Sequence, residues 1–264
     1  MLVAAAGCLV AACSAAPEST GAAVVPSPAT SSAPALSPSV PPSTVPERAA
    51  PLVVLDPGHN GGNARHPGEI NRPVPAGRGR TKACNTTGTS TDAGYAEHAF
   101  TFDVARRVGE LLTARGVRVA YTRTDDEGVG PCVDERARIG NAAGADAVVS
   151  IHADGSRAAG AHGFHVAYSA PPLNDAQGEP ALRLARAVRD GMRDAGLAVA
   201  GYLGERGLAA RDDLAGLNLS TRPAVLVECG NMRDPAEAAA MSSAAGRQRY
   251  AEAITTGIAA YLDR

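Results

Sequence analysis

The sequence predicts an α/β domain whose mainly parallel sheet is covered by helices on both faces. Segments of strand length alternate along the chain with segments that have the 3.6-residue period of a helix. Several strand-like segments, such as 52–55 and 224–227, are apolar throughout and do not alternate with polar residues. Continuous apolar strands are typical of parallel sheets that are buried on both faces. Residues 49–264 have the length of one such domain.

The first half of the domain begins with the strand at 52–55. Residues 60–94 follow; they are rich in Gly, Pro, Asn, Arg and Thr and have no apolar period, so we expect a long irregular loop of functional importance. A helix is expected over 96–115, with Gly116 as its stop. Its apolar residues recur at helical spacing, namely Phe100, Val104, Val108 and Leu111.

The second half continues the alternation of strands and helices. In chain order we expect a strand at 117–124, a short helix at 133–144, strands at 147–154 and 163–169, an amphipathic helix at 178–196, a strand at 224–230 and a helix at 235–262. Ligands of open parallel sheets bind at the carboxyl ends of the strands. Residues at those ends are therefore the first candidates for a site.

Ionisable residues stand at the carboxyl ends of three expected strands. His59 follows the first strand, His152 ends the segment VVSIH, and Glu228 ends the segment AVLVE. Glu97 opens the first helix, three residues before Phe100, so it falls on the apolar side of that helix. All four side chains could therefore converge in one crevice.

Two imidazoles and one carboxylate are a recurring ligand set for catalytic zinc, with water in the fourth position. A further carboxylate is then needed to take a proton from that water and deliver it to the leaving nitrogen. Each residue also has an ordinary interpretation. His59 and His152 could be hydrogen-bonded residues next to strands, and Glu97 could be a first-turn acid favoured by the helix dipole. Glu228 is harder to dismiss, because an unpaired buried carboxylate is costly.

Four stretches in sequence order resemble the zinc-dependent N-acetylmuramoyl-L-alanine amidases of the bacterial cell wall, of the Amidase_3 type. They are VVLDPGHNGG, YAEHAFTFDVARRV, RARIGNAAGADAVVSIHADG and RPAVLVECGNMRDPAE, and the resemblance covers about residues 51–264. It implies a six-stranded sheet, one zinc ion (Zn2+), and cleavage of the amide between the lactyl group of muramic acid and the first L-Ala of the stem peptide.

The resemblance also implies a role for each of the four residues. His59, Glu97 and His152 match the family's zinc ligands, and Glu228 matches its catalytic glutamate. The expected partners are peptidoglycan or muramoyl-peptide fragments, acted on by a monomer. Two alternatives stay open: a zinc peptidase that cuts within the stem peptide, and a non-catalytic peptidoglycan-binding lipoprotein.

Other polar residues are weaker candidates. His98 is turned about 100° around its helix from Glu97 and should face elsewhere. Asn231 could contact substrate or form a turn, and Arg123 and Arg136 are interpreted as structural ion-pair residues. Alternates to the chosen histidine ligands are His66, His162 and His165.

The first 48 residues differ in composition from the domain. Residues 1–13 form a short apolar run of signal-peptide type without the usual basic residues, and they end in VAAC, which resembles a lipobox. Lipidation of Cys13 and cleavage elsewhere are both open. Residues 14–48 are rich in Ala, Pro, Ser and Thr and are interpreted as a disordered tether. We therefore expect export to the periplasm or cell envelope, where a lipid on Cys13 would give an anchor at the outer face of the cytoplasmic membrane.

The three cysteines outside the leader have different expected states. Cys84 and Cys132 lie in Gly/Pro-rich segments and are expected to form a disulfide in an oxidising compartment. Cys229, inside an apolar strand, is expected to be a buried thiol.

The formal net charge of −2 gives no support for nucleic-acid binding. After the leader, no apolar stretch approaches the roughly 20 residues that span a bilayer.

Overall fold

The computed structural model describes residues 49–263 of the chain. The expected leader at 1–13, with Cys13, and the tether at 14–48 lie outside the described residues. Within the described range, no helix has both the length and the apolar character that a membrane crossing requires.

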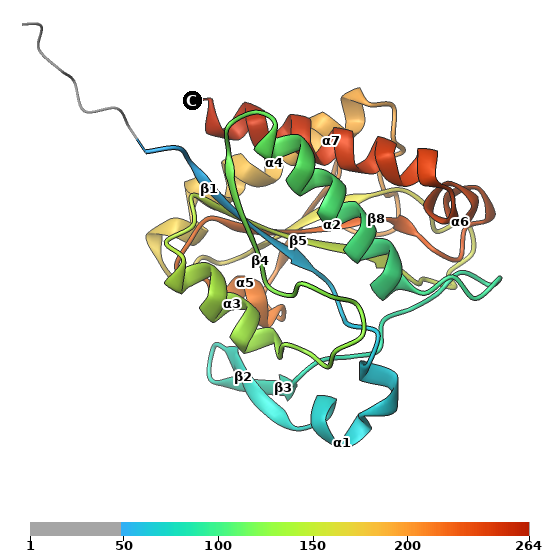
Figure 1. The fold of residues 1–264 in the computed structure, drawn as a ribbon, viewed down its shortest axis with the longest axis horizontal. Helices are drawn as coiled ribbons and strands as arrows, with labels where there is room; N and C mark the ends of the chain where they lie inside the picture. Colours follow the sequence, from blue (N-terminus) through green and yellow to red (C-terminus); the bar gives the residue numbers. More distant parts are fainter. Residues whose placement is uncertain (1–48, 264) are drawn as a thin grey trace, which may run out of the picture. The chain divides into compact units, whose positions relative to one another are not determined.

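A six-stranded sheet forms the centre of the domain, in the order β4-β1-β5-β8-β6-β7 (Figure 1). Neighbouring strands are parallel except β6 and β8, which are antiparallel. The prediction of a mainly parallel sheet is therefore confirmed. The strands are β1 (Leu52–Pro57), β4 (Arg118–Tyr121), β5 (Ala147–Asp154), β6 (His165–Ser169), β7 (Leu208–Arg211) and β8 (Ala224–Asn231).

Helices cover both faces of this sheet, as expected (Figure 1). One face packs against α2 (Glu97–Thr113), α4 (Glu179–Asp194) and α7 (Ala244–Leu262). The opposite face packs against α3 (Val133–Ala142) and α5 (Ala215–Asn218). The short helix α6 (Pro235–Ser242) precedes α7.

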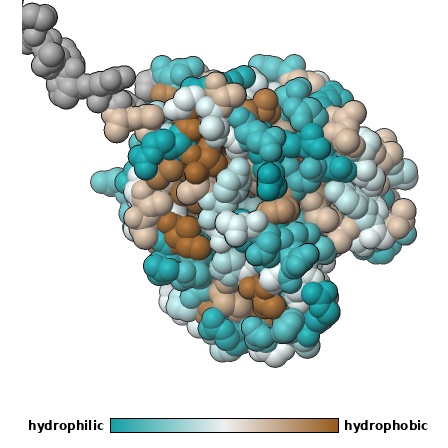
Figure 2. Space-filling model, viewed as in Figure 1, coloured by the Kyte–Doolittle hydropathy of each residue, from teal (hydrophilic) through white to brown (hydrophobic). Residues whose placement is uncertain are grey.

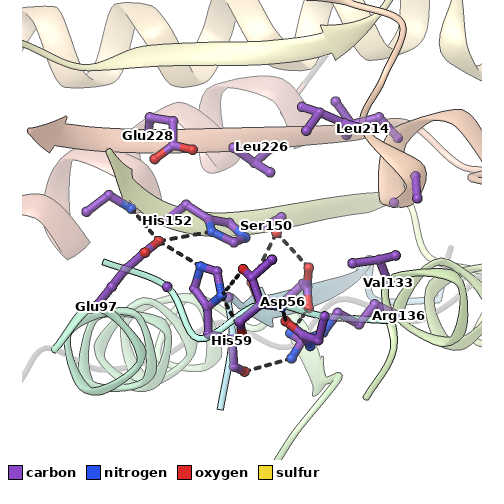
Figure 3. Close-up of a pocket in the computed structure, with 18 of the residues that line it drawn as sticks. Asp56, His59, Glu97, Val133, Arg136, Ser150, His152, Leu214, Leu226 and Glu228 are labelled. Atoms are coloured by element: carbon purple, nitrogen blue, oxygen red, sulfur yellow. Dashed lines mark hydrogen bonds and ion pairs between the residues drawn. The ribbon is translucent and has the colours of Figure 1, made fainter. Parts of the chain in front are cut away.

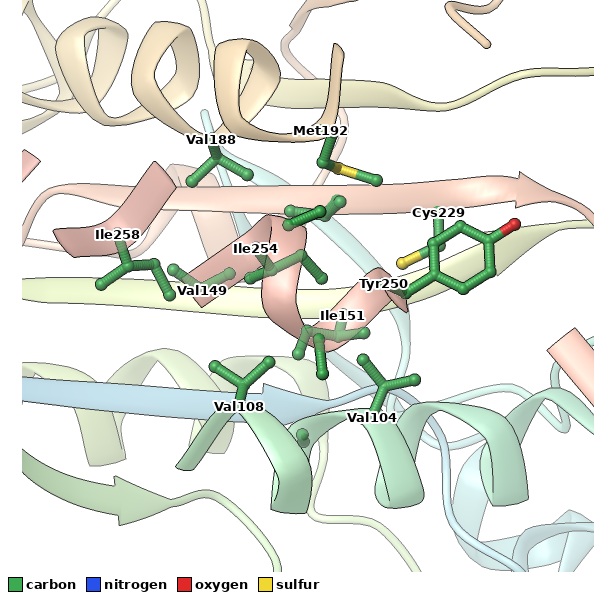
Figure 4. Packing of buried hydrophobic residues seen from close by; sticks show 14 of the residues in the cluster. Val104, Val108, Val149, Ile151, Val188, Met192, Cys229, Tyr250, Ile254 and Ile258 are labelled. Atoms are coloured by element: carbon green, nitrogen blue, oxygen red, sulfur yellow. The ribbon is translucent and has the colours of Figure 1, made fainter. Parts of the chain in front are cut away.

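The larger apolar cluster lies between the sheet and helices α2, α4 and α7 (Figure 4). Alternate residues of the central strands enter it, for example Val149 and Ile151 of β5, and they meet Val104, Val188 and Ile254 of the three helices. The intervening residues of the same strands face the other side. This alternation leaves the α3–α5 face free to carry polar side chains near the strand ends.

The surface seen in Figure 2 mixes hydrophilic residues with small separate groups of hydrophobic ones. Among residues 49–263, Leu173 is the one large hydrophobic residue classed as exposed, at 48% of its full area. The large apolar side chains of the described domain are therefore used almost entirely in packing.

The expectation of an irregular loop over 60–94 is wrong for residues 63–83 and is confirmed for residues 84–94, which contain no helix or strand. The segment contains a 3-10 turn (Asn63–Arg65), α1 (Pro67–Ile70) and an antiparallel hairpin of β2 (Pro73–Gly77) and β3 (Arg80–Ala83). Pro73 and Pro75 made β2 unrecognisable as a strand in the sequence, because proline is depleted in most strands. It is tolerated in a two-stranded ribbon with free edges. Arg78 and Gly79 both have positive φ, as a two-residue hairpin turn requires.

Two further differences concern the second half of the chain. Helix 235–262 is in fact two helices, α6 and α7, separated at Ser243, whose hydroxyl accepts a hydrogen bond from the Gly246 N–H as an N-cap. Strand β7 and helix α5 were not predicted, because each has only four residues and no clear period.

The expected disulfide between Cys84 and Cys132 is confirmed. It joins the end of β3 to the start of α3, which ties the hairpin to the main domain. Cys229 is a buried thiol, also as expected, and burial raises its pKa well above the usual value.

Helices α4 and α7 approach each other closely at two glycines, Gly191 and Gly257. A Cβ on Gly257 would lie 2.5 Å from the Val188 Cα and 2.6 Å from the Ala187 carbonyl oxygen. Both atoms belong to the backbone of α4, so neither can move aside without moving the helix.

We therefore expect Gly257→Ala to lower the free energy of unfolding by about 1–3 kcal/mol through overpacking. Urea denaturation measures this change. Gly68→Ala is the matched control, because a Cβ at Gly68 meets nothing within 4 Å. Equal stability of the two variants would contradict the close helix contact.

Candidate functional site

Four predicted residues meet at the carboxyl ends of the central strands (Figure 3). His59 follows β1, His152 lies on β5 and Glu228 on β8, and Glu97 is the first residue of α2. His152 and Glu228 are paired across β5 and β8, so their side chains lie on the same face of the sheet. The two histidines and two glutamates line one pocket of about 370 Å³.

His59, Glu97 and His152 form a group that could hold a metal ion. One ligand atom from each lies within 4.8 Å of the others. Oε1 of Glu97 lies 3.1 Å from His59 Nε2 and 3.1 Å from His152 Nδ1. Two imidazole nitrogens and one carboxylate oxygen directed at a common point are the donor set of an open zinc site.

Backbone groups orient the side chains of His59 and Glu97. His59 Nδ1 lies 3.1 Å from the Thr86 carbonyl oxygen, and this contact places the ring proton on Nδ1 and leaves Nε2 to face Glu97. The N–H groups of Thr89 and Ala153 donate to the two oxygens of Glu97, at 2.8 and 3.1 Å. Thr86 and Thr89 belong to the segment that had been expected to be irregular.

The two glutamates of the pocket have opposite electrostatic environments. Burial alone would raise the pKa of Glu97, but the two imidazoles and their hydrogen bonds outweigh it and hold the pKa well below its usual value. Burial raises the pKa of Glu228 well above its usual value, and the nearby carboxylates Glu97 and Asp154 add to the rise. Burial also lowers the pKa of His152, which favours the neutral, ligating form.

Glu228 is buried on β8 beside the candidate metal site, which we define as His59, Glu97 and His152. Its carboxylate faces the pocket that His152 also enters (Figure 3). Its Oε2 atom is buried and has no hydrogen-bond partner among residues 49–263. A buried carboxyl group that faces a pocket and has a raised pKa is a candidate for proton transfer. Glu228 is therefore the candidate general base of this pocket.

The turn that carries His59 has an unusual backbone. His59 has φ of 59°, in the left-handed region that residues other than glycine rarely adopt. At Gly58, a Cβ would lie 2.3 Å from the His152 ring, so only glycine allows the two histidines to come together. Arg136 holds the turn by donating to the carbonyl oxygens of Pro57 and His59, both at 2.7 Å.

Arg136 is itself fixed by a buried ion pair. Its Nη1 lies 2.6 Å from Oδ1 of Asp56, and the two side chains are 6% and 11% exposed. Ser150 and Thr122 also donate to Asp56, each at 2.6 Å. Burial opposes ionisation of Asp56, but Arg136 and these hydrogen bonds lower its pKa from 3.8 to about 2.

The weaker candidates from the sequence lie outside the candidate metal site of His59, Glu97 and His152. His98 pairs with Asp126 at 2.7 Å, as its position on the helix predicted, and His66 pairs with Glu69 at 2.9 Å. Asn231 is buried and donates to the carbonyl oxygens of Ser156 and Ala161, so its side chain fixes loop backbone. Arg123 pairs with Asp126 at 2.9 Å, which is the structural ion pair expected of it, and it also donates to the carbonyl oxygens of Pro57 and Gly58.

Comparisons with known proteins agree with this architecture. Residues 53–260 match the family model described as N-acetylmuramoyl-L-alanine amidase. An N-acetylmuramoyl-L-alanine amidase of Mycobacterium tuberculosis is 51% identical over 221 residues, which are 83% of this chain and 90% of that protein.

Solved structures of similar proteins have the same fold. The amidase Ami1 of Mycobacterium smegmatis is 51% identical, with a TM-score of 0.79 over 82% of this chain and 99% of its own. The apo form of Ami1 from Mycobacterium abscessus is 55% identical, with a TM-score of 0.78 over 81% of this chain and 99% of its own. The amidase AmiC2 of Nostoc punctiforme is 26% identical, with a TM-score of 0.62 over 81% and 98% of the respective chains.

We expect Arg136→Met to lower the free energy of unfolding at neutral pH by about 3–5 kcal/mol, because it leaves the Asp56 carboxylate buried without its cation. Chemical denaturation as a function of pH tests this. In the wild type, the depressed pKa of Asp56 contributes about 2 kcal/mol above pH 3.8, and this contribution is lost as pH falls through about 2. In Arg136→Met, a smaller part of the free energy of unfolding should be lost over the same fall in pH.

Arg138→Met is the matched control on the same helix. Arg138 pairs with Glu135 at the surface and is 67% exposed. Its loss should change stability by no more than about 0.5 kcal/mol. If both variants unfold at the same denaturant concentration, Arg136 does not stabilise the turn in the way described.

Proposed function

The chain belongs to the N-acetylmuramoyl-L-alanine amidase family, and on that premise we propose that it hydrolyses the amide between the lactyl group of N-acetylmuramic acid and the L-alanine of the stem peptide in peptidoglycan. The observation that supports this most directly is the convergence of His59, Glu97 and His152 beside Glu228 in one pocket. The substrate is peptidoglycan or its muramoyl-peptide fragments.

We propose that one zinc ion is held by His59, Glu97 and His152. Zinc favours nitrogen and oxygen ligands in this combination and leaves a further position open in catalytic sites. The His59 ring donates to the Thr86 carbonyl oxygen, and the N–H groups of Thr89 and Ala153 donate to Glu97; such outer contacts hold the ligands in place and increase metal affinity. When bound there, zinc would polarise the scissile carbonyl and lower the pKa of water to about 7.

Glu228 then moves the proton. It accepts a proton from the attacking water as the water oxygen bonds to the carbonyl carbon, and it gives that proton to the nitrogen of L-Ala as the C–N bond breaks. The products are a free lactyl carboxylate and a stem peptide with a free amino terminus. Burial of Glu228 raises its pKa, which suits a group that must both take up and release a proton.

We expect Glu228→Gln to retain bound zinc and to lose about 10²–10⁴-fold in kcat, because the amide keeps the shape of the side chain and cannot accept the proton. Metal analysis and kinetics on the same preparation measure both effects. His59→Ala should behave differently and lose the zinc itself. A fully active Glu228→Gln enzyme would remove Glu228 from the proton-transfer role, and a zinc content unaffected by His59→Ala would remove His59 from the ligand set.

The bond that is cut distinguishes the proposed activity from its two alternatives. With a purified muramoyl-peptide and added zinc, mass spectrometry should detect a muramic acid with a free lactyl carboxylate and an intact peptide that begins with L-Ala. Shortened peptides still attached to muramic acid would instead identify a peptidase. Absence of any product would favour a non-catalytic peptidoglycan-binding protein.

We further propose that residues 49–264 are the catalytic domain of an exported enzyme that acts as a monomer in the periplasm or cell envelope. A substrate in the cell wall requires this location, and the Cys84–Cys132 disulfide is consistent with an oxidising compartment. The leader at 1–13, the tether at 14–48 and a lipid on Cys13 stay predictions from the sequence.

A further inference from the structure

Two arginines lie beside the pocket, on the loops that follow strands β5 and β8. Arg157 comes after the end of β5, and Arg233 comes after the end of β8. Both guanidinium groups approach Oδ1 of Asp92, Arg233 through Nη1 at 2.6 Å and Arg157 through Nη2 at 3.8 Å. Asp92 belongs to segment 84–94, which also supplies residues that line the pocket. We call Arg157, Arg233 and Asp92 the rim cluster.

A chain of contacts connects the rim cluster to the candidate metal site. Nη2 of Arg233 donates to Thr89 Oγ1 at 3.4 Å, and the Thr89 N–H donates to Glu97 at 2.8 Å. Thr89 and Gly155 both line the pocket, and a Cβ on Gly155 would lie 2.3 Å from Thr89 Oγ1. Only Thr89 therefore stands between the Arg233 guanidinium and Glu97. A molecule that extends along the pocket from Glu97 past Thr89 reaches this guanidinium.

The hydrogen-bonding capacity of Arg233 is only partly used. Its side chain is 20% exposed, and its Nε is buried without a hydrogen-bond partner among residues 49–263. Its ion-pair partner Asp92 is 70% exposed. The adjacent Asp234 is occupied elsewhere, because its carboxylate accepts from the N–H groups of Ala236 and Glu237 at the start of α6. A largely buried guanidinium is thus compensated by one exposed ion pair, which contributes little to stability.

The rim cluster has the chemistry of a carboxylate-binding site. A guanidinium presents parallel N–H groups that match the two oxygens of a carboxylate. Arg233 and Arg157 both approach the same oxygen of Asp92, so the two-oxygen geometry is not used. Two positive charges and one negative charge leave one positive charge in the cluster. Asp92 itself shows that a carboxylate carried on a peptide chain can reach Arg233.

We propose that Arg233 is a specificity-determining residue, which binds a carboxylate of the stem peptide beyond L-Ala, and that Asp92 takes the place of this carboxylate when no substrate is bound. The inference rests on the proposed function, which places the amide of L-Ala at the candidate metal site. The stem peptide continues from L-Ala and, like any peptide, carries a carboxylate at its carboxyl terminus. Arg157, which is 73% exposed, supplies a second positive charge.

Arg233→Met tests the proposal with two forms of one peptide. The first is a stem peptide that begins with L-Ala, and the second is the same peptide with its carboxyl groups converted to amides. In calorimetric titrations of the full chain with added zinc, we expect the wild type to bind the acid form about 10–100-fold more tightly. Arg233→Met should lose this preference. With muramoyl-peptides as substrates, the same preference should appear in KM, with kcat little changed.

Asp92→Ala separates a stand-in carboxylate from a structural ion pair. Without Asp92, the acid form of the peptide no longer has to displace a surface ion pair, so its affinity should rise by up to about 5-fold. The affinity of the amide form should not rise. If the Arg233–Asp92 pair only joined two loops, its loss would weaken the binding of both forms or change neither.

Arg189→Met is the matched control. Arg189 lies on α4, is 17% exposed, pairs with Asp190 at 2.7 Å and does not line the pocket. This variant should keep the wild-type kcat and the preference for the acid form. Because every variant is compared on two forms of one peptide, a loss of stability affects both forms alike and cannot imitate the expected result.

The outcomes distinguish this inference from the proposed function. If the wild type releases no product from a muramoyl-peptide and still prefers the acid form of the stem peptide through Arg233, the proposed function fails and the carboxylate site stands. If the wild type cleaves the muramoyl-peptide but binds both forms equally, the carboxylate site is wrong. It is also wrong if Arg233→Met keeps the preference, or if Asp92→Ala does not bind the acid form more tightly.

Discussion

The buried carboxylate of Glu97 is the group on which the rest of the site depends. An ionised carboxylate taken out of water needs several donors at once to offset its desolvation. Glu97 has them from three different segments: the imidazole of His59, the imidazole of His152 with the neighbouring Ala153 N–H on β5, and the backbone N–H of Thr89. The first helix, two strand ends and one loop must therefore meet at a single point.

The scaffold around Glu97 is built to keep that meeting point fixed. His59 reaches it from a turn with left-handed backbone, and Arg136 compensates by donating to that turn while it pairs with Asp56. The Cys84–Cys132 disulfide fixes the beginning of the segment that supplies Thr86 and Thr89. The turn and the disulfide-anchored loop thus support the side chains of His59 and Glu97.

The pocket places two carboxylates of the same chemical type in different electrostatic environments. Glu97, surrounded by imidazoles and N–H groups, stays ionised and suits a cation. Glu228 lies in the same pocket and forms no ion pair with the residues at 49–263, and burial raises its pKa. Environments that drive two pKa values apart in this way are characteristic of hydrolytic sites.

The sequence by itself determined the class of fold and predicted which four ionisable residues meet in the pocket. His59, His152 and Glu228 stand at the carboxyl ends of apolar strands. Parallel strands bring these ends to one edge of the sheet, and this rule was enough to predict that the three residues meet. The position of Glu97 followed from helical spacing, and the disulfide followed from the composition around its two cysteines.

Only the tertiary structure decided the hairpin at 73–83, the antiparallel course of β6 and the donors that surround Glu97. Backbone N–H groups are the same in every residue except proline, so no sequence pattern marks Thr89 or Ala153 as donors. His165 became a neighbour of Glu228 through the order of strands in the sheet, which depends on pairing between segments about 60 residues apart and leaves no local pattern in either of them.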